Sequence, residues 1–217
     1  MAIAKGKSNI KSERDLVILG IGEQISILNN DQTHIEKSIN TQLVNIQSDS
    51  TIDNEEKTSI KRPLLEELQD IQEKHIRIRR TILIGMYTFW ELSLQAILGL
   101  KNAKFNDSKK KNDTTKNKQK SIAWNYLNAI YEGNIPAAAL DIDDKVRVLR
   151  NHMVHGKLAQ GQLAQLKDFS KCHPELYLTV SIDGCNFLNY NGLFNLLDII
   201  SSELNNAEVQ ICNVEEG

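Results

Sequence analysis

The chain has 217 residues, of which 41% are hydrophobic and 25% are charged; these are ordinary values for a soluble globular protein with one core of its own. The formal net charge of -2 excludes an overall basic field, so any affinity for nucleic acid has to come from local patches. Three cysteines without a CxxC spacing indicate a reducing compartment rather than a disulfide framework.

No targeting segment or membrane span is expected. The stretch before Arg14 contains lysines but no apolar run, so it is unlike a secretory signal. The apolar stretches elsewhere are interrupted by polar residues well short of the ~20 positions that a span needs. We therefore expect a cytoplasmic protein that does not contact a membrane.

Apolar periodicity predicts two long helices in the first half of the chain. Residues 1–12 are polar and are expected to be flexible. From Glu13 to Gln47, apolar residues return at steps of three and four, the repeat of a helix with one buried face. Residues 48–59 have loop composition. The repeat resumes from Arg62 to Leu100, where Pro63 suits the first turn, and its near-heptad seam predicts antiparallel packing on the first helix.

Two polar features lie on the second of these helices. His75 interrupts the apolar seam, and we interpret it as a residue at the edge of the core with a hydrogen bond, rather than as a ligand. Arg77, Arg79 and Arg80 form a basic run that either binds phosphate or belongs to a solvated helix face. The solvated face is favoured, so none of these residues is assigned to a site.

The segment from Lys101 to Lys120 is strongly basic, with eight lysines against two aspartates. Its composition predicts a mobile loop. Two interpretations stay open: a solubilising loop, or a flexible arm that gathers RNA by its phosphates. In the second interpretation Lys109, Lys110 and Lys111 are candidate RNA-binding residues.

Two shorter helices are expected next. Ser121 suits the N-cap of a helix that ends near Glu132. A second helix should begin with Asp141 or Asp143 as its cap, since acidic residues complement the positive end of a helix dipole. Gly156 stands where a left-handed C-cap residue is favoured, and it ends this helix.

The period changes in the last third of the chain. Apolar and polar residues alternate from Leu176 to Tyr190 around Asp183-Gly184, which predicts a small β-hairpin. A final helix is expected from Gly192 to Val209. The fold class is therefore mainly α with one hairpin, a single domain over residues 13–209 and a tail at residues 210–217.

The sequence Arg150-Asn151-His152-Met153-Val154-His155-Gly156 carries the candidate chemistry. Cleavage of RNA through its own 2′-hydroxyl needs a group that moves a proton near neutral pH, and the imidazole of His155 is suited to that. It also needs a permanent cation for the developing phosphate charge, which the guanidinium of Arg150 supplies. Asn151 adds a neutral amide for a phosphate or ribose contact. No metal or cofactor is expected.

The spacing of these residues raises a geometric difficulty. In a helix, five residues turn by about 140°, so Arg150 and His155 do not share a face, whereas Asn151 and His155 do. One histidine is also too few to act as separate base and acid. A two-fold homodimer that brings two motifs together would remove both difficulties.

The motif resembles the R-x(4-6)-H signature of the HEPN superfamily, small helical domains that include ribonuclease toxins and phage-defence effectors. The segment Tyr87 to Glu91 is similar to the aromatic-then-Glu segment on an earlier helix of bacterial members. The resemblance implies a HEPN-like helical bundle and a homodimer. It also implies a metal-independent endoribonuclease that acts on tRNA or mRNA and leaves 2′,3′-cyclic phosphate ends. An antitoxin or defence protein would then be a partner.

Three further residues are considered with the motif. Glu91 lies in an apolar run and would orient the motif by pairing with Arg147 or Arg150; the alternative is an ordinary exposed glutamate. His152 is expected to face out of the helix near the phosphate path, and a metal site made with His155 lacks further ligands at a matching spacing. Lys157 is a candidate RNA contact, at a position where some HEPN toxins carry a modifiable tyrosine.

Three alternatives to a nuclease remain open. An arginine and a histidine can simply end a helix, where both stabilise its negative pole. The domain can instead be a non-catalytic HEPN-type module that binds a nucleotide or a protein in a toxin–antitoxin or defence complex. Finally, it can be a helical scaffold whose long helices pair with another chain.

Overall fold

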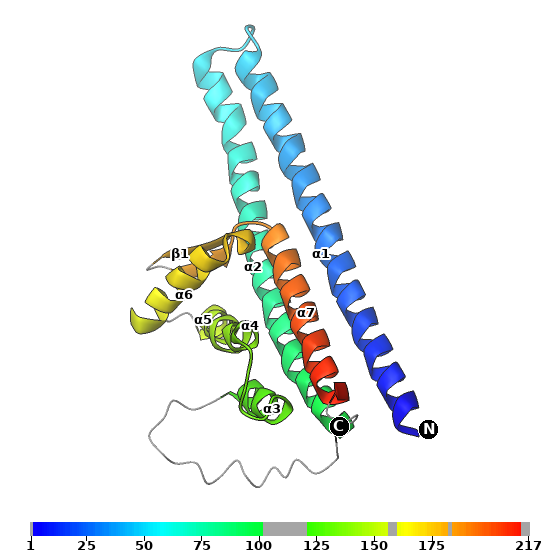
Figure 1. The fold of residues 1–217 in the computed structure, drawn as a ribbon. Coiled ribbons are helices and arrows are strands. Elements are labelled where there is room, and N and C mark those ends of the chain that lie inside the picture. The colour runs from blue at the N-terminus through cyan, green and yellow to red at the C-terminus, as the bar shows by residue number, and fades with distance from the viewer. Residues whose placement is uncertain (1, 102–120, 156–159, 182–183, 214–217) are drawn as a thin grey trace.

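The computed structural model describes residues 2–101, 121–155, 160–181 and 184–213. Of the residues that it describes, 86% are helical, and one small antiparallel hairpin lies near the C-terminus. The mainly α class with a late hairpin is thereby confirmed. Figure 1 shows two long helices side by side, with the shorter elements gathered around one half of their length.

The two long helices are α1 (Ala2–Ser48) and α2 (Asn54–Lys101), and they run antiparallel as predicted. Helix α1 begins at Ala2, where we expected a flexible start. Helix α2 begins well before Arg62, because the Asp53 side chain accepts a hydrogen bond from the Glu56 backbone N–H at 2.8 Å and so caps its first turn. Pro63 therefore lies inside the helix, and the predicted first-turn position is wrong.

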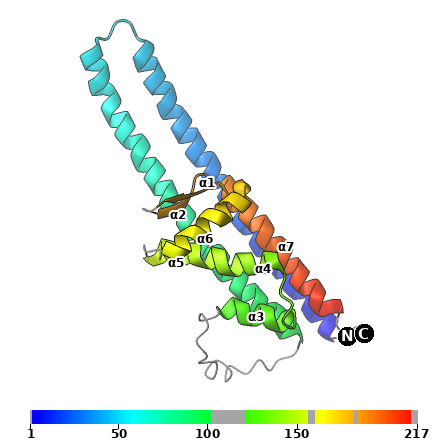
Figure 2. The same ribbon diagram turned by 60° about the vertical axis from the view of Figure 1, so that its left-hand side comes forward.

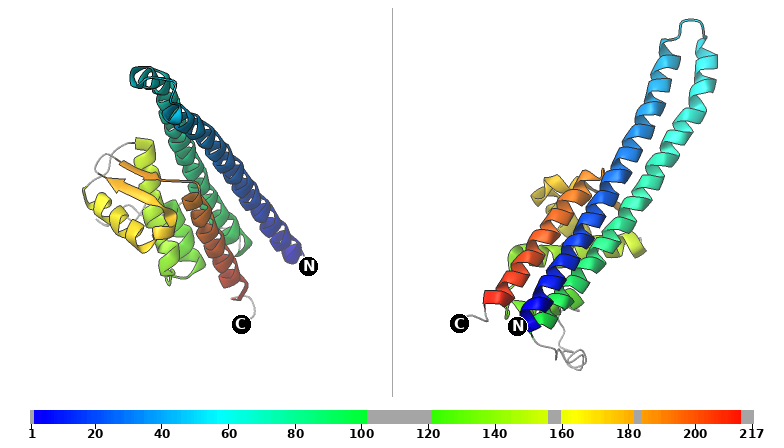
Figure 3. Two further views of the ribbon diagram at one scale, coloured as in Figure 1. Left: turned by 90° about the horizontal axis from the view of Figure 1, so that it is seen from above. Right: turned by 90° about the vertical axis from the view of Figure 1, so that its right-hand side faces the viewer.

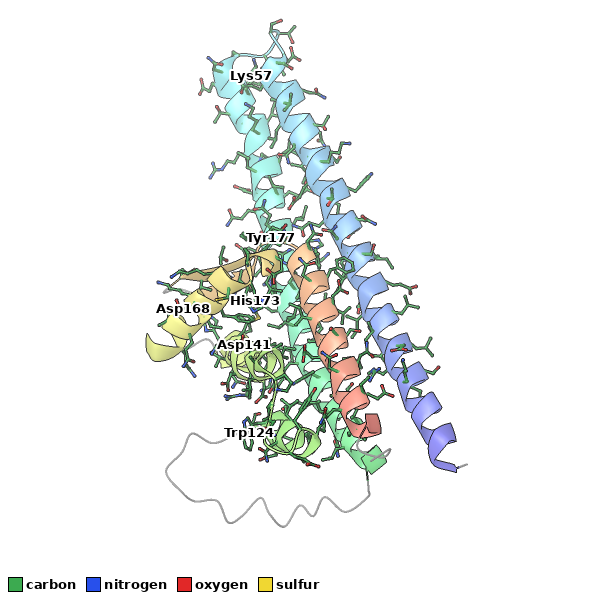
Figure 4. All side chains as sticks on the ribbon, viewed as in Figure 1. Lys57, Trp124, Asp141, Asp168, His173 and Tyr177 are labelled. Atoms are coloured by element: carbon green, nitrogen blue, oxygen red, sulfur yellow. The ribbon has the colours of Figure 1, made fainter. Side chains whose placement is uncertain are left out.

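The outer halves of α1 and α2 project beyond the rest of the molecule as a two-helix arm (Figures 1 and 2). Lys57 lies at its far end, next to the turn that joins the helices (Figure 4), and donates from its Nζ to the backbone oxygen of Gln47 at 3.2 Å. Lys61 hydrogen-bonds the side chain of Gln47 one turn further along. These contacts close the tip with exposed polar groups.

Helix α7 (Asn191–Asn213) packs beside the inner halves of α1 and α2 (Figure 3). Arg14 of α1 is only 5% exposed, and it donates to Asn205 Oδ1 at 2.6 Å and pairs with Glu208 Oε2 at 2.9 Å. A buried guanidinium needs such partners. The ion pair therefore joins the N-terminal part of α1 to the C-terminal part of α7.

The remaining helical elements lie on the side of α2 away from α1 (Figure 3). The Ser121 hydroxyl caps the first of them by accepting from the Trp124 backbone N–H at 2.8 Å, as predicted. Tyr87 and Trp90 of α2 are buried beneath this group. The elements are α3 (Ile122–Ile130), α4 (Ala137–Asp141), the π-helical turn η2 (Ile142–Val146), α5 (Arg147–His155) and α6 (Gln160–Cys172), the last of which we did not predict.

The predicted hairpin is confirmed. Strands β1 (Leu178–Ser181) and β2 (Gly184–Phe187) pair antiparallel, with Ser181 opposite Gly184, so the chain reverses between these two residues and the glycine of the predicted Asp-Gly begins the second strand. A 3-10 turn, η3 (Pro174–Leu176), precedes the hairpin. A Cβ on Gly192 at the start of α7 would lie 2.0 Å from the backbone oxygen of Leu176, so this contact requires glycine.

Two of the three arginines of the basic run, at the root of the arm, do not lie on a solvated face, whereas Arg77 is exposed. Arg79 is 4% exposed, donating from Nε to the Phe187 carbonyl at 3.1 Å and from Nη1 to Gln32 at 3.0 Å. Arg80 donates to Asn186 Oδ1 at 2.9 Å. Both arginines fasten the hairpin to α2. The predicted solvated face is therefore wrong for them, and the reason is that strand β2 covers this side of the helix.

His75 lies next to this contact and is buried. Its Nδ1 is 2.7 Å from the hydroxyl of Tyr190, as the interpretation of a hydrogen-bonded core-edge residue requires. Burial lowers the pKa of His75, and the nearby charge of Arg79 lowers it further. Both effects favour the neutral imidazole at the point where α2 meets the start of α7.

Helix α2 contains one window that is long and apolar enough to cross a membrane by length and composition alone. No such window is expected from the sequence, because polar residues interrupt every apolar stretch. In α2 these polar residues are mostly uncharged, so they lower the mean hydropathy of the window only slightly. The core helix of a soluble protein meets the same criteria, and 33% of this window is buried inside the structure.

Candidate functional site

Asp143 lies beneath the candidate motif and is almost completely buried, at 1% exposed. Elements α4, η2 and α5 follow one another without a break, so neither Asp141 nor Asp143 caps a helix start, contrary to prediction. Asp143 instead accepts hydrogen bonds from the Ser121 hydroxyl at 2.6 Å and the Tyr87 hydroxyl at 3.2 Å. Burial raises the pKa of Asp143, while these two donors oppose that change.

Arg150 lies on α5 where this helix contacts α2. Its Nη1 donates to the Oδ1 of Asn151 at 2.8 Å. Its guanidinium carbon is 5.7 Å from the ring centroid of Tyr87, within the range of a cation–π contact. Arg150 is only partly buried, whereas Tyr87 is 1% exposed. A buried aromatic ring therefore lies against the guanidinium of a side chain that is itself only partly buried.

Glu91 lies one turn after Tyr87 on α2 and is partly buried. Burial raises the pKa of Glu91; the charge of Arg150 lowers it, and that of Asp143 raises it. A hydrogen bond from the Tyr87 side chain and the charge of Arg147 lower the pKa of Glu91 further, each more weakly than Arg150 does. The structure thus brings Glu91 near the two arginines that were expected to partner it.

Arg147 completes this group. Its Nη2 is 3.5 Å from Asp144 Oδ1, and its buried Nε has no hydrogen-bond partner among the described residues. The Nε of Arg150 is likewise buried without a partner there. The two arginines and the four residues next to their guanidinium groups are called the Arg150 cluster below. The cluster consists of Tyr87, Glu91, Asp143, Arg147, Arg150 and Asn151.

His152 lies outside this cluster, and its predicted outward orientation is wrong. The residue is 8% exposed, and its Nε2 accepts the backbone N–H of Cys185 at 3.2 Å. Burial lowers the pKa of His152, with a further lowering from the charge of Arg80. Helix α5 lies between α2 and strand β2, so a residue two positions after Arg150 faces the hairpin rather than solvent.

Several predicted site residues lie outside the described part of the chain. Helix α5 ends at His155, whose side chain is not described, and the same holds for Gly156. Among the described residues, no three His, Cys, Asp or Glu side chains gather to hold a metal. The candidate RNA-binding lysines are also outside, namely Lys109, Lys110, Lys111 and Lys157.

Two residues of this neighbourhood were not recognised from the sequence as partners of the motif. Ser121 was predicted only as a cap, and Asp143 was placed at a helix start because acidic residues gather there. A signal for Asp143 was present: it follows Ala139 by four residues and precedes Val146 by three, so it belongs to the buried stripe.

Comparisons of the chain with family models, with curated proteins and with solved structures found no match. The resemblance to HEPN proteins therefore depends on the motif residues quoted above.

Proposed function

We propose that this protein is a metal-independent endoribonuclease of the toxin or antiviral-defence kind, acting in the cytoplasm on tRNA or mRNA. The observation that carries the proposal is the arrangement of Arg150. Arg150 lies on α5, the helix that ends at His155. Its guanidinium lies over the buried ring of Tyr87, donates a hydrogen bond to Asn151 and is near Glu91 of α2. Such preorganisation is what a phosphate-stabilising cation needs.

In the proposed reaction the 2′-hydroxyl of a ribose attacks the adjacent phosphorus. The imidazole of His155 takes the proton of that hydroxyl, a bond forms between the 2′-oxygen and phosphorus, and the bond from phosphorus to the 5′-oxygen breaks. The protonated His155 of the second protomer in the proposed homodimer gives a proton to the leaving 5′-oxygen, so the products carry a 2′,3′-cyclic phosphate and a 5′-hydroxyl. Arg150 stabilises the negative charge on the phosphate oxygens, and Asn151 orients its guanidinium.

A homodimer is part of the proposal, and one face of α2 suits it. Residues at alternating steps of three and four form an exposed face without charge, next to Glu91. A Cβ at Gly85 or Gly99 would meet nothing within 4 Å, and Leu92 is 59% exposed, so a second helix can approach closely. Pairing through this face would place two Arg150 clusters near one another. The face consists of Thr81, Gly85, Thr88, Leu92, Gln95 and Gly99.

The test is to incubate the full chain with total RNA in excess EDTA and to determine the chemistry of the cut ends. We expect cleavage with 2′,3′-cyclic phosphate ends in the wild type and loss of cleavage in His155→Ala. The variant His34→Ala is a matched control, because His34 is an exposed histidine on the arm. No cleavage by the wild type, or equal cleavage by His155→Ala, would contradict the proposal.

The alternative function is a non-catalytic module that binds a nucleotide or an antitoxin or defence partner. The contacts that Arg150 makes within its own chain favour it, since a guanidinium engaged by Tyr87 and Asn151 also suits stable binding of a phosphate. This alternative predicts no toxicity on expression and a loss of binding alone in Arg150→Ala.

A further inference from the structure

We infer that Tyr87 is a positioning residue for Arg150, and that its own orientation is set by Asp143 and Ser121. The consequence for cleavage rests on the proposed function, but the contacts themselves do not. They form a series that starts at the N-cap of α3, passes through Asp143 of the π-helical turn η2 and Tyr87 of α2, and ends at the candidate phosphate-binding arginine on α5.

The first step of this series is the contact between ring and guanidinium. Tyr87 is 1% exposed, so its ring has little freedom to move, and the guanidinium carbon of Arg150 lies 5.7 Å from the ring centroid. A cation is attracted to the face of an aromatic ring rather than to its edge. The orientation of the ring therefore decides where the guanidinium is most stable.

The second step is the hydrogen bond that fixes the ring. The Tyr87 hydroxyl donates to Asp143 Oδ1 at 3.2 Å, and a buried carboxyl group of this kind requires donors. Burial and the negative charges of Asp143 and Glu91 raise the pKa of Tyr87, so the phenol keeps its proton and remains a donor. The ring of Tyr87 is thus held at both ends, by its attachment to the backbone of α2 and by the hydrogen bond of its hydroxyl to Asp143.

The third step fixes Asp143 itself. The Ser121 hydroxyl donates to Asp143 at 2.6 Å and at the same time accepts from the Trp124 backbone N–H at 2.8 Å. One hydroxyl therefore serves both the start of α3 and the carboxylate. Asp143 is reached by donors from two different elements, so it cannot shift without breaking at least one of these bonds.

This series predicts that Tyr87 affects cleavage only through Arg150. We expect Tyr87→Phe, which keeps the ring but loses the hydroxyl's contacts with Asp143 and Glu91, to lower kcat for RNA cleavage by about tenfold with little change in KM, as for an interaction that acts in the transition state. Tyr177→Phe is the control, because Tyr177 is an exposed tyrosine directly before strand β1, outside the Arg150 cluster.

A double-mutant cycle separates positioning from a general effect on folding. Cleavage is measured with protein in excess over RNA for the wild type, Tyr87→Phe, Arg150→Ala and the double variant. We expect Tyr87→Phe to cause no further loss in the Arg150→Ala background. An equal fold-loss in both backgrounds would overturn the inference, because Tyr87 would then act independently of Arg150.

A second readout does not depend on activity. In the ¹⁵N-labelled full chain, the Nε–Hε NMR signal of Arg150, assigned by its absence in Arg150→Lys, should be displaced by the ring of Tyr87. We expect Tyr87→Leu and Asp143→Asn each to move this signal toward the position of a free arginine, and Tyr177→Phe to leave it in place.

The two readouts distinguish failure of this inference from failure of the proposed function. An Arg150 signal that is unmoved in both variants would overturn the inference, whether or not the protein cleaves RNA. A moved signal in a protein that cleaves no RNA would support the positioning contact and contradict the nuclease. Asp143→Asn is nearly isosteric, so the experiment remains decisive if Tyr87→Leu does not fold.

Discussion

His152 accepts a hydrogen bond at Nε2 from the backbone N–H of Cys185, 3.2 Å away, and so ties the motif helix α5 to strand β2. The two histidines of the motif are thereby separated in role, since His152 is buried and engaged within the fold. Because Nε2 accepts a hydrogen bond, the neutral imidazole carries its proton on Nδ1. An imidazole that binds a phosphate through both nitrogens would instead have to donate from both of them.

The first prediction concerns this histidine. His152→Ala should lower the free energy of unfolding by about 2 kcal/mol, because the substitution leaves a small cavity and an unpaired buried N–H at Cys185. His152→Asn, which can still accept a hydrogen bond, should lose less. Urea unfolding measures both. If His152→Ala is as stable as the wild type, the bond to Cys185 contributes nothing to the fold.

The second prediction is a loss of stability in mild acid. The pKa values of His75 and His152 are lowered from the ordinary 6.5, so the unfolded chain binds protons more readily than the folded chain below that value. Their contribution to stability is therefore full above pH 6.5 and is lost as the pH falls toward the lowered pKa values. The slope of unfolding free energy against pH in this window should be smaller in His75→Gln.

Buried acidic groups act with the opposite sign. The pKa values of Asp143, Glu91 and Glu203 are raised by burial, so the folded chain holds their protons more tightly. Their contribution is present at low pH and is lost as the pH rises through the raised values. The acid loss predicted above is therefore assigned to histidine only if it shrinks in His75→Gln; an unchanged slope would contradict that assignment.

The third prediction tests the root of the arm. Arg79→Ala should destabilise the protein by about 2–3 kcal/mol, since it leaves the Phe187 carbonyl without its buried donor and removes the contact over the Tyr190 ring. Arg77→Ala, at an exposed position two residues earlier, should change stability by less than about 0.5 kcal/mol. Equal effects of the two substitutions would show that Arg79 does not fasten the hairpin.

The parts of the fold that depend on local sequence could be predicted. The cap at Ser121 and the pairing of the hairpin strands are set by a few neighbouring residues, and both are found as expected. The antiparallel pairing of α1 and α2 follows from a long repeat. These features do not require knowledge of which elements meet in space.

The parts that depend on tertiary contacts could not be predicted. The burial of Arg79 and His152 follows from where strand β2 lies, and the sequence does not specify that position. The role of Asp143 requires Ser121 and Tyr87 to converge from two other helices. For the candidate site, the adjacency of Glu91 and Arg150 could be anticipated, because an apolar run with one carboxylate requires a partner.

The last prediction concerns the proposed dimer. The exposed face of α2 around Leu92 carries no charge, and Glu91 borders it, so Leu92→Glu would place new carboxylates opposite each other across a two-fold axis. Like charges brought together at such an interface cost several kcal/mol, enough to dissociate a weak dimer. Light scattering should give a dimer for the wild type and a monomer for Leu92→Glu.

Leu65→Glu is the matched control, because Leu65 is a similarly exposed leucine on the arm, 52% exposed against 59% for Leu92. RNA cleavage should fall together with dimerisation in Leu92→Glu and persist in Leu65→Glu. A wild type that stays monomeric at every working concentration would contradict a shared site, and a Leu65→Glu variant that alone dissociates would place the interface on the arm instead.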